Sequence, residues 1–159
     1  TRKPEPRGRL ALIGDSYAVG LGPELEKLLV PTGFYEGFEY EGHVGASTQQ
    51  WLSRIASGQW GTKIATFKPK TVLVSLGVND GATPNPDFYR ALVMVFQAGG
   101  ARVIWIQPPA AVNTPAHAII ASLGVQTIPA TNTPLSADKL HPASYAPWAH
   151  EIAGEITRG

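Results

Sequence analysis

The chain has 159 residues, of which 43% are hydrophobic, which is enough for one domain with its own core and too few for two domains of ordinary size. Charged residues make up 16% and the formal net charge is +1, so no strongly basic surface indicates nucleic acid as a partner. Cysteine is absent, which excludes disulfides, thiolate metal sites and a cysteine nucleophile.

The first eight residues are polar, basic and interrupted by prolines. We interpret residues 1–8 as a flexible lead-in or the end of a linker, and residues 9–159 as a single domain. The chain begins at Thr1 and not at a methionine. Earlier removal of a targeting segment would explain this start, which favours a secreted or extracytoplasmic location. No apolar stretch approaches the roughly 18 residues of a membrane-spanning helix, so we expect no integral membrane segment.

Apolar, β-prone runs alternate with segments of helical periodicity along the rest of the chain. This alternation predicts an α/β fold with a five-stranded parallel sheet covered by helices on both faces. We expect strands at residues 9–13, 38–44, 71–76, 102–107 and 125–128, and helices at residues 23–30, 48–57, 87–97, 115–123 and 143–157.

A Gly-Asp-Ser tripeptide at residues 14–16 follows directly on the first predicted strand. A serine at this point lies at the carboxyl edge of the sheet, where open α/β proteins bind ligands, so Ser16 is a candidate nucleophile. An ordinary turn has the same composition. Because Gly20 and Gly22 interrupt the next segment, we expect the regular helix to begin only near Pro23, with little helix-dipole effect at Ser16.

A serine hydroxyl needs a base to remove its proton, and histidine suits this task because its pKa lies near neutrality. His141 is the candidate base. Asp138 lies three residues earlier, a spacing that lets a tight loop bring its carboxylate to the imidazole Nδ1. Taken singly, Asp138 is also typical of a helix cap or turn, and His141 before Pro142 is typical of a helix entrance.

An acyl-transfer site also needs hydrogen-bond donors for the negative oxygen of the tetrahedral intermediate. We assign this oxyanion hole to the backbone N–H groups of Ser16 and Gly45 and to the side-chain amide of Asn79. Alternatively, Gly45 is a turn glycine with positive φ, and Asn79 forms a turn. We interpret Asp80 as a structural residue that orders the same loop.

These residues resemble, in order and approximate spacing, the four blocks of the SGNH hydrolases, also called GDSL esterases. The resemblance implies a flavodoxin-like, three-layer α/β/α fold and a triad of Ser16, Asp138 and His141. Tyr17 departs from the leucine usual in the family and is a candidate substrate-binding residue beside the nucleophile. Residues 45–50 also look like the second block of the lysophospholipase and thioesterase branch. The matching segments are Gly14-Asp15-Ser16, Gly45, Gly77-Val78-Asn79-Asp80 and Asp138-Lys139-Leu140-His141-Pro142.

The proline-rich loop at residues 107–114 follows the fourth predicted strand, so Asn113 is a second candidate for substrate binding, although the loop also suits a stiff connection. His43, His117 and His150 are too scattered for a metal site, and we expect no metal. Of the three, His43 adjoins the predicted oxyanion loop and is the candidate to approach substrate. The glycine pattern after the first strand matches no nucleotide-binding motif, so no cofactor is expected.

Together, these features predict a cofactor-free serine esterase that hydrolyses short-chain acyl esters, acetyl esters of carbohydrates especially, through an acyl-serine intermediate. Three alternatives stay open: an O-acyltransferase with the same triad, a hydrolase of the lysophospholipase or thioesterase type, and a catalytically idle module that binds glycan or a protein partner. The sequence does not predict an oligomeric state.

Overall fold

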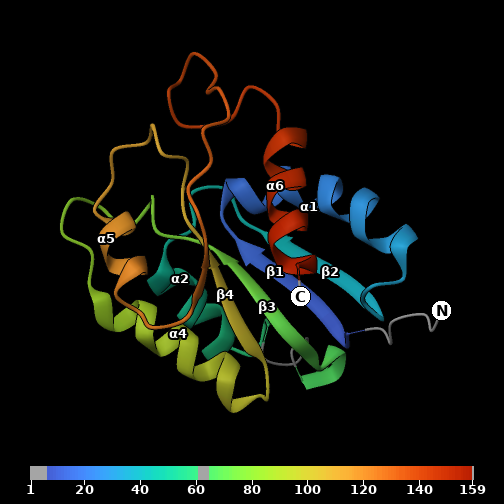
Figure 1. Ribbon diagram of the computed structural model, residues 1–159. Helices are drawn as coiled ribbons and strands as arrows, with labels where there is room; N and C mark the ends of the chain where they lie inside the picture. The colour runs from blue at the N-terminus through green and yellow to red at the C-terminus, as the bar shows by residue number, and fades with distance from the viewer. Residues whose placement is uncertain (1–6, 61–64, 159) are drawn as a thin grey trace.

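The computed structural model describes residues 7–60 and 65–158. Its centre is a five-stranded sheet of parallel strands in the spatial order β2-β1-β3-β4-β5, which confirms the predicted sheet (Figure 1). β1 lies between β2 and β3, and its last residue, Gly14, is opposite Gly42 and Ser75. The loops that follow these three strands therefore begin at one edge of the sheet. The strands are β1 (Arg9–Gly14), β2 (Gly37–Gly42), β3 (Pro69–Ser75), β4 (Arg102–Ile106) and β5 (Gln126–Ile128).

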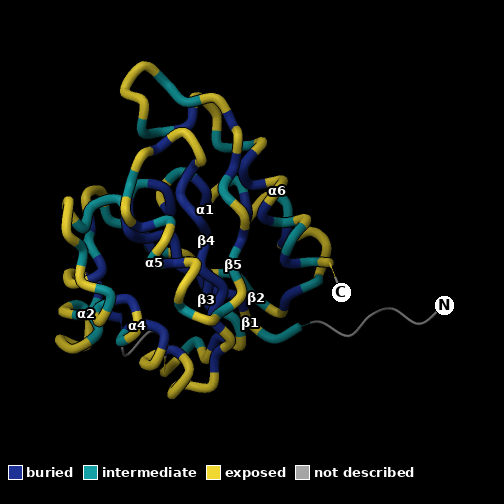
Figure 2. Tube along the Cα trace, turned by 60° about the vertical axis from the view of Figure 1, so that its left-hand side comes forward, coloured by how far each residue is buried: buried dark blue, intermediate teal, exposed yellow. Residues whose placement is uncertain are grey.

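Helices cover both faces of the sheet, as the predicted three-layer α/β/α arrangement requires (Figure 1). The first and last helices pack together on one face, and the middle helices cover the other. Figure 2 shows buried strands at the centre, surrounded by exposed loops and helix surfaces. The helices are α1 (Ser16–Leu29), followed by the 3-10 turn η1 (Val30–Thr32), α2 (Thr48–Ala56), α4 (Pro86–Ala98), α5 (Ala116–Ala121) and α6 (Ala146–Thr157).

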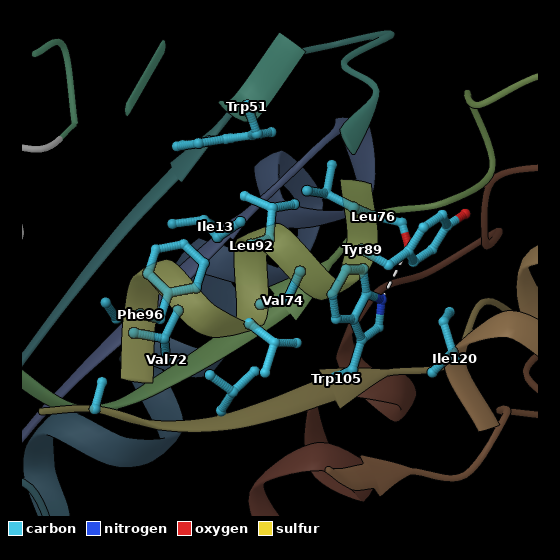
Figure 3. Packing of buried hydrophobic residues seen from close by; sticks show 14 of the residues in the cluster. Ile13, Trp51, Val72, Val74, Leu76, Tyr89, Leu92, Phe96, Trp105 and Ile120 are labelled. Atoms are coloured by element: carbon cyan, nitrogen blue, oxygen red, sulfur yellow. Dashed lines mark hydrogen bonds between the residues drawn. The ribbon is translucent and has the colours of Figure 1, made fainter. Parts of the chain in front are cut away.

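Each face of the sheet has its own apolar cluster. In the cluster beneath α2 and α4, Trp105 stacks on Tyr89 with ring centroids 5.2 Å apart, and its Nε1 donates to the carbonyl oxygen of Leu76 at 3.0 Å (Figure 3). The other three tryptophans are Trp51, Trp60 and Trp148. All four are at most 2% exposed and belong to the core.

Helix α1 begins at Ser16, so the prediction of a start near Pro23 was wrong. Gly20 and Gly22 lie inside the helix because neighbouring aromatic rings occupy the space of their missing side chains. A Cβ at Gly20 would lie 2.4 Å from the Tyr145 ring, and one at Gly22 would lie 2.2 Å from the Tyr40 ring. Packing of these rings offsets the roughly 1 kcal/mol by which each glycine disfavours a helix.

The predicted lead-in, residues 1–8, falls mostly outside the described residues. Its last two residues are hydrogen-bonded to the domain. Arg7 N–H donates to the carbonyl oxygen of Phe34 at 2.8 Å, and the carbonyl oxygen of Gly8 accepts from Glu36 N–H at 2.9 Å. Among the helices formed by residues 7–60 and 65–158, none has the length and apolar character needed to cross a membrane.

Candidate active site

Ser16 is presented by a tight turn between β1 and α1. The turn brings the end of β1 so close to β3 that a Cβ at Gly14 would lie 2.4 Å from the Ser75 carbonyl oxygen, which explains the glycine. Asp15 caps the helix by accepting from Tyr17 N–H at 2.9 Å. Ser16 is thus the first residue of a 14-residue helix, whose first N–H groups have no partner within the helix and carry partial positive charge. The helix-dipole effect that we discounted does reach Ser16.

The structure brings together the three residues predicted to form a triad. Ser16 Oγ lies 2.8 Å from His141 Nε2, and His141 Nδ1 lies 2.6 Å from Asp138 Oδ2. When Nδ1–H donates to the Asp138 carboxylate, Nε2 is free to accept the proton of the Ser16 hydroxyl. The side chains of His141 and Asp138 are 35% and 50% exposed, so the site opens directly to solvent.

The second oxygen of Asp138 organises the loop that carries His141. Oδ1 accepts from the N–H groups of Leu140 and His141, each at 2.9 Å, and from the hydroxyl of Ser136 at 2.8 Å. These bonds, together with the stronger one to the imidazole, hold the pKa of Asp138 well below its usual range. Asp138 therefore also forms the turn that was its alternative interpretation. Sequence reasoning missed Ser136, although a serine two residues before the aspartate is a usable signal.

This loop is a narrow hairpin closed by a bridge between Leu135 and Pro142. Ser136 N–H donates to the carbonyl oxygen of His141 at 2.8 Å, which sets the imidazole at the end of the hairpin. Lys139 adopts a left-handed conformation with φ of 58°, which costs roughly 1–2 kcal/mol for a residue with a Cβ. The hydrogen bonds of Asp138 hold the loop in this conformation.

Tyr17 is buried against the His141 ring, which corrects the prediction that it contacts substrate. Its side chain is 1% exposed, and its hydroxyl donates to the Leu140 carbonyl oxygen at 2.9 Å. The ring contacts His141 edge-on, with centroids 5.9 Å apart, and Trp148 in the same way at 5.2 Å. Tyr17 therefore packs against His141 from the buried side, a role that its position in the sequence does not reveal.

The predicted oxyanion donors come from three loops at one sheet edge. Gly45 has φ of 78°, so its alternative interpretation as a turn glycine also applies, and no atom lies within 4 Å of a Cβ built there. Asn79 Nδ2 donates to Asp15 Oδ2 and to the carbonyl oxygen of Ala46, each at 3.2 Å. These two bonds join the Asn79 loop to the residues that adjoin Ser16 and Gly45.

Asp80 fastens the same loop to the start of α2. Its carboxylate accepts from Thr48 N–H at 3.0 Å and from the Thr48 hydroxyl. Thr48 is fully buried, and Ser47 before it caps α2 by accepting from Gln50 N–H. This contact agrees with the structural role predicted for Asp80.

Asn113 lies in a hollow of about 630 Å³ next to the triad loop. Leu140, the neighbour of His141, and Val78, the neighbour of Asn79, border the same hollow. Val112 and Thr114 also line it, so the loop at residues 107–114 forms part of the wall of this hollow.

The remaining histidines lie outside the triad. His43 Nε2 lies 3.1 Å from Glu41 Oε2, and its ring is 5.7 Å from that of Trp51. His117 uses both ring nitrogens, toward Gln107 Oε1 at 2.9 Å and the Val112 carbonyl oxygen at 3.0 Å. Within residues 7–60 and 65–158, no group of three or more histidine or acidic side chains could hold a metal ion.

No protein-family model matches the chain, and no curated protein matches it. Solved structures do share its fold. An acetyl xylan esterase, AlAXEase, is similar with a TM-score of 0.72 and 17% identity over 93% of this chain and 99% of that one. TesA has a TM-score of 0.70 and 22% identity over 93% and 97%. A GDSL-like lipase from Bacteroides thetaiotaomicron has a TM-score of 0.64 and 17% identity over 94% and 86%.

Identities this low show the fold alone. Two of these proteins are named as an esterase and a lipase, and the shared fold extends over 86% or more of each chain compared. The α/β/α architecture implied by the resemblance to GDSL esterases is therefore confirmed.

Proposed function

We propose that this protein is a serine esterase of the SGNH type that hydrolyses short-chain acyl esters through an acyl-serine intermediate. The observation that carries the proposal is the chain of contacts from Ser16 Oγ to His141 Nε2 at 2.8 Å and from His141 Nδ1 to Asp138 Oδ2 at 2.6 Å. The three groups lie within hydrogen-bond reach in the order that nucleophilic catalysis requires.

In the first half of the reaction, Ser16 Oγ attacks the ester carbonyl carbon while its proton passes to His141 Nε2. Asp138 stabilises the resulting imidazolium, and the N–H groups of Ser16 and Gly45 and the Asn79 amide bind the oxyanion. The alcohol leaves with the proton from His141, and the acyl group stays on Ser16. In the second half, His141 takes a proton from water, the hydroxide oxygen attacks the acyl carbon, and the acid departs as Ser16 regains its proton.

Two hollows lie beside the catalytic loops, and the more polar of them suits a polar alcohol such as a carbohydrate. Both border the loop that follows β3. One, of about 630 Å³, contains Asn113 and apolar residues such as Val112. The other, of about 270 Å³, is lined mainly by hydroxyl, amide and carboxylate side chains: Ser47, Gln49, Asn79, Asp80, Thr83 and Asn85, with Phe88. One of the proteins of similar fold is named as an acetyl xylan esterase.

Hydrolysis of p-nitrophenyl acetate and of acetylated xylan or chitooligosaccharide tests the proposal. Ser16→Ala is expected to lower kcat at least 10⁴-fold as a rough estimate, because it removes the nucleophile. The matched control is Ser122→Ala, which changes an exposed serine at the end of α5 and is expected to keep full activity. Equal rates in wild type and Ser16→Ala would contradict the proposal.

Two further measurements separate the alternatives. Product analysis with an acceptor sugar distinguishes hydrolysis from acyl transfer: free acid in excess supports the esterase, and acylated sugar in excess supports the transferase. A fluorophosphonate should label wild type at Ser16, and folded protein that resists labelling would instead indicate a binding module.

A further inference from the structure

The carboxamide of Asn79 is held between two oxygen atoms from distant parts of the chain. Its Nδ2 donates to Asp15 Oδ2 and to the Ala46 carbonyl oxygen, each at 3.2 Å. If the carboxamide were turned over, its Oδ1 would face these two acceptors with no hydrogen between them while Asp15 is ionised. The two oxygens therefore fix the Asn79 nitrogen toward the residues that adjoin Ser16 and Gly45.

Asp15 is a fully buried carboxyl group that the catalytic steps above do not use. Oδ1 accepts from Tyr17 N–H at 2.9 Å and caps α1, while Oδ2 faces Asn79. Burial raises the pKa of this carboxyl to about 7, even though the Tyr17 N–H bond opposes the rise. Serine or asparagine would cap the helix without a buried charge, so capping alone does not account for an aspartate.

We propose that Asp15 is a positioning residue that orients the Asn79 carboxamide as an oxyanion donor. The inference rests on the proposed esterase function, in which one hydrogen of Asn79 Nδ2 binds the oxyanion. Both hydrogens are engaged in the free protein, so substrate must replace one partner. The carbonyl of Ala46 is the partner replaced, because a hydrogen bond to an ionised carboxylate is about twice as strong as one to a neutral acceptor.

The protonation state of Asp15 controls this orientation. Protonated Asp15 accepts a weaker hydrogen bond from Asn79 Nδ2 and can donate its own hydrogen to Asn79 Oδ1, so only the Ala46 carbonyl oxygen still favours the nitrogen and the oxyanion hole is weaker. The charges that Asp15 meets are those of His141, which favours ionisation, and Asp80, which opposes it. The phenols of Tyr17 and Tyr145 have pKa values raised by burial and stay neutral near neutral pH.

Nuclear magnetic resonance tests the orientation in the resting protein, without any catalytic readout. The side-chain NH₂ signal of Asn79 is assigned by its loss in Asn79→Ala. Its chemical shift is expected to change with pH around the Asp15 pKa of about 7. The shift should persist in His141→Ala and vanish in Asp15→Ser, which keeps a hydroxyl cap on α1. A signal that does not move with pH, or that moves equally in Asp15→Ser, would overturn the inference.

Kinetics of p-nitrophenyl acetate hydrolysis tests the consequence for catalysis. Asp15→Asn places an amide nitrogen opposite Asn79, and we expect kcat to fall roughly 100- to 1000-fold, as on loss of one oxyanion donor, with KM nearly unchanged. Asp15→Ser should lose less than Asp15→Asn, because serine offers no competing donor at the position of Oδ2.

A double-variant cycle shows whether Asp15 acts through Asn79. In the Asn79→Ala background, Asp15→Asn should lower kcat no further, whereas effects that multiply would overturn the inference. Absence of ester hydrolysis by wild type would refute the proposed function instead, because the magnetic resonance result does not depend on turnover.

Discussion

Replacing Asp15 by serine is expected to change how the stability of this protein depends on pH. The carboxyl is fully buried, and its pKa is raised from 3.8 to about 7, chiefly because burial disfavours the charged form. Asp15→Ser removes the titrating group and keeps an oxygen that can cap α1.

The sign and size of the effect follow from proton binding. Between pH 3.8 and about 7, the folded protein holds a proton on Asp15 that the unfolded chain has released. Unfolding therefore releases this proton, and the free energy of unfolding falls as pH rises through the interval. At about 1.4 kcal/mol for each unit of pKa, the contribution of Asp15 amounts to a loss of about 4 kcal/mol once it is complete.

Urea unfolding followed by the fluorescence of the buried tryptophans measures this change, at several pH values between about 4 and about 8. Taking the difference between wild type and Asp15→Ser cancels the contributions of the other titrating groups. We expect that difference to move by as much as about 4 kcal/mol in favour of the variant as pH rises. A constant difference would refute the argument that Asp15 becomes charged at a cost in the folded protein.

Three more substitutions test the site. Asp138→Asn should lower kcat about 10⁴-fold by favouring the wrong tautomer of His141, while circular dichroism shows an intact fold; a loss of less than about tenfold would contradict this role. Tyr17→Phe removes the hydroxyl bond to the Leu140 carbonyl oxygen and should cost about 1 kcal/mol in urea unfolding; a large rise in KM at unchanged stability would place Tyr17 against substrate after all. Asn113→Ala should raise KM for acetylated oligosaccharide by about three- to tenfold and leave p-nitrophenyl acetate hydrolysis unchanged; equal effects on both would argue against a sugar contact.

The residue types of the triad could be predicted because each follows a recognisable strand or lies at a short, fixed spacing. Ser16 comes directly after an apolar strand, and Asp138 lies three residues before His141. Parallel strands place such segments at one edge of a sheet, and the contacts at 2.8 Å and 2.6 Å agree with that expectation. The hydrogen-bond partners of these residues were harder to predict from the sequence. Asp138 also accepts from the Ser136 hydroxyl, and Ser136 had been assigned no role.

The start of α1 was mispredicted because intrinsic helix preference depends only on the local sequence. Gly20 and Gly22 disfavour a helix by that measure. In the folded protein they admit the rings of Tyr145 and Tyr40, which lie far away along the chain. Packing of these rings against α1 outweighs the local preference, and the helix extends back to Ser16.

The succession of strands and helices and the chemical groups at the sheet edge could be read from the sequence, because both follow from local periodicity and residue type. The packed fold was needed to show that Tyr17 contacts His141 from inside the core and that Asp15 faces Asn79. These roles depend on contacts between segments far apart in the chain: 64 positions separate Asp15 from Asn79, and 123 separate Tyr17 from Leu140. The Gly-Asp-Ser turn indicates a nucleophile from the local sequence alone. The burial that raises the pKa of its aspartate exists only after the loops have packed.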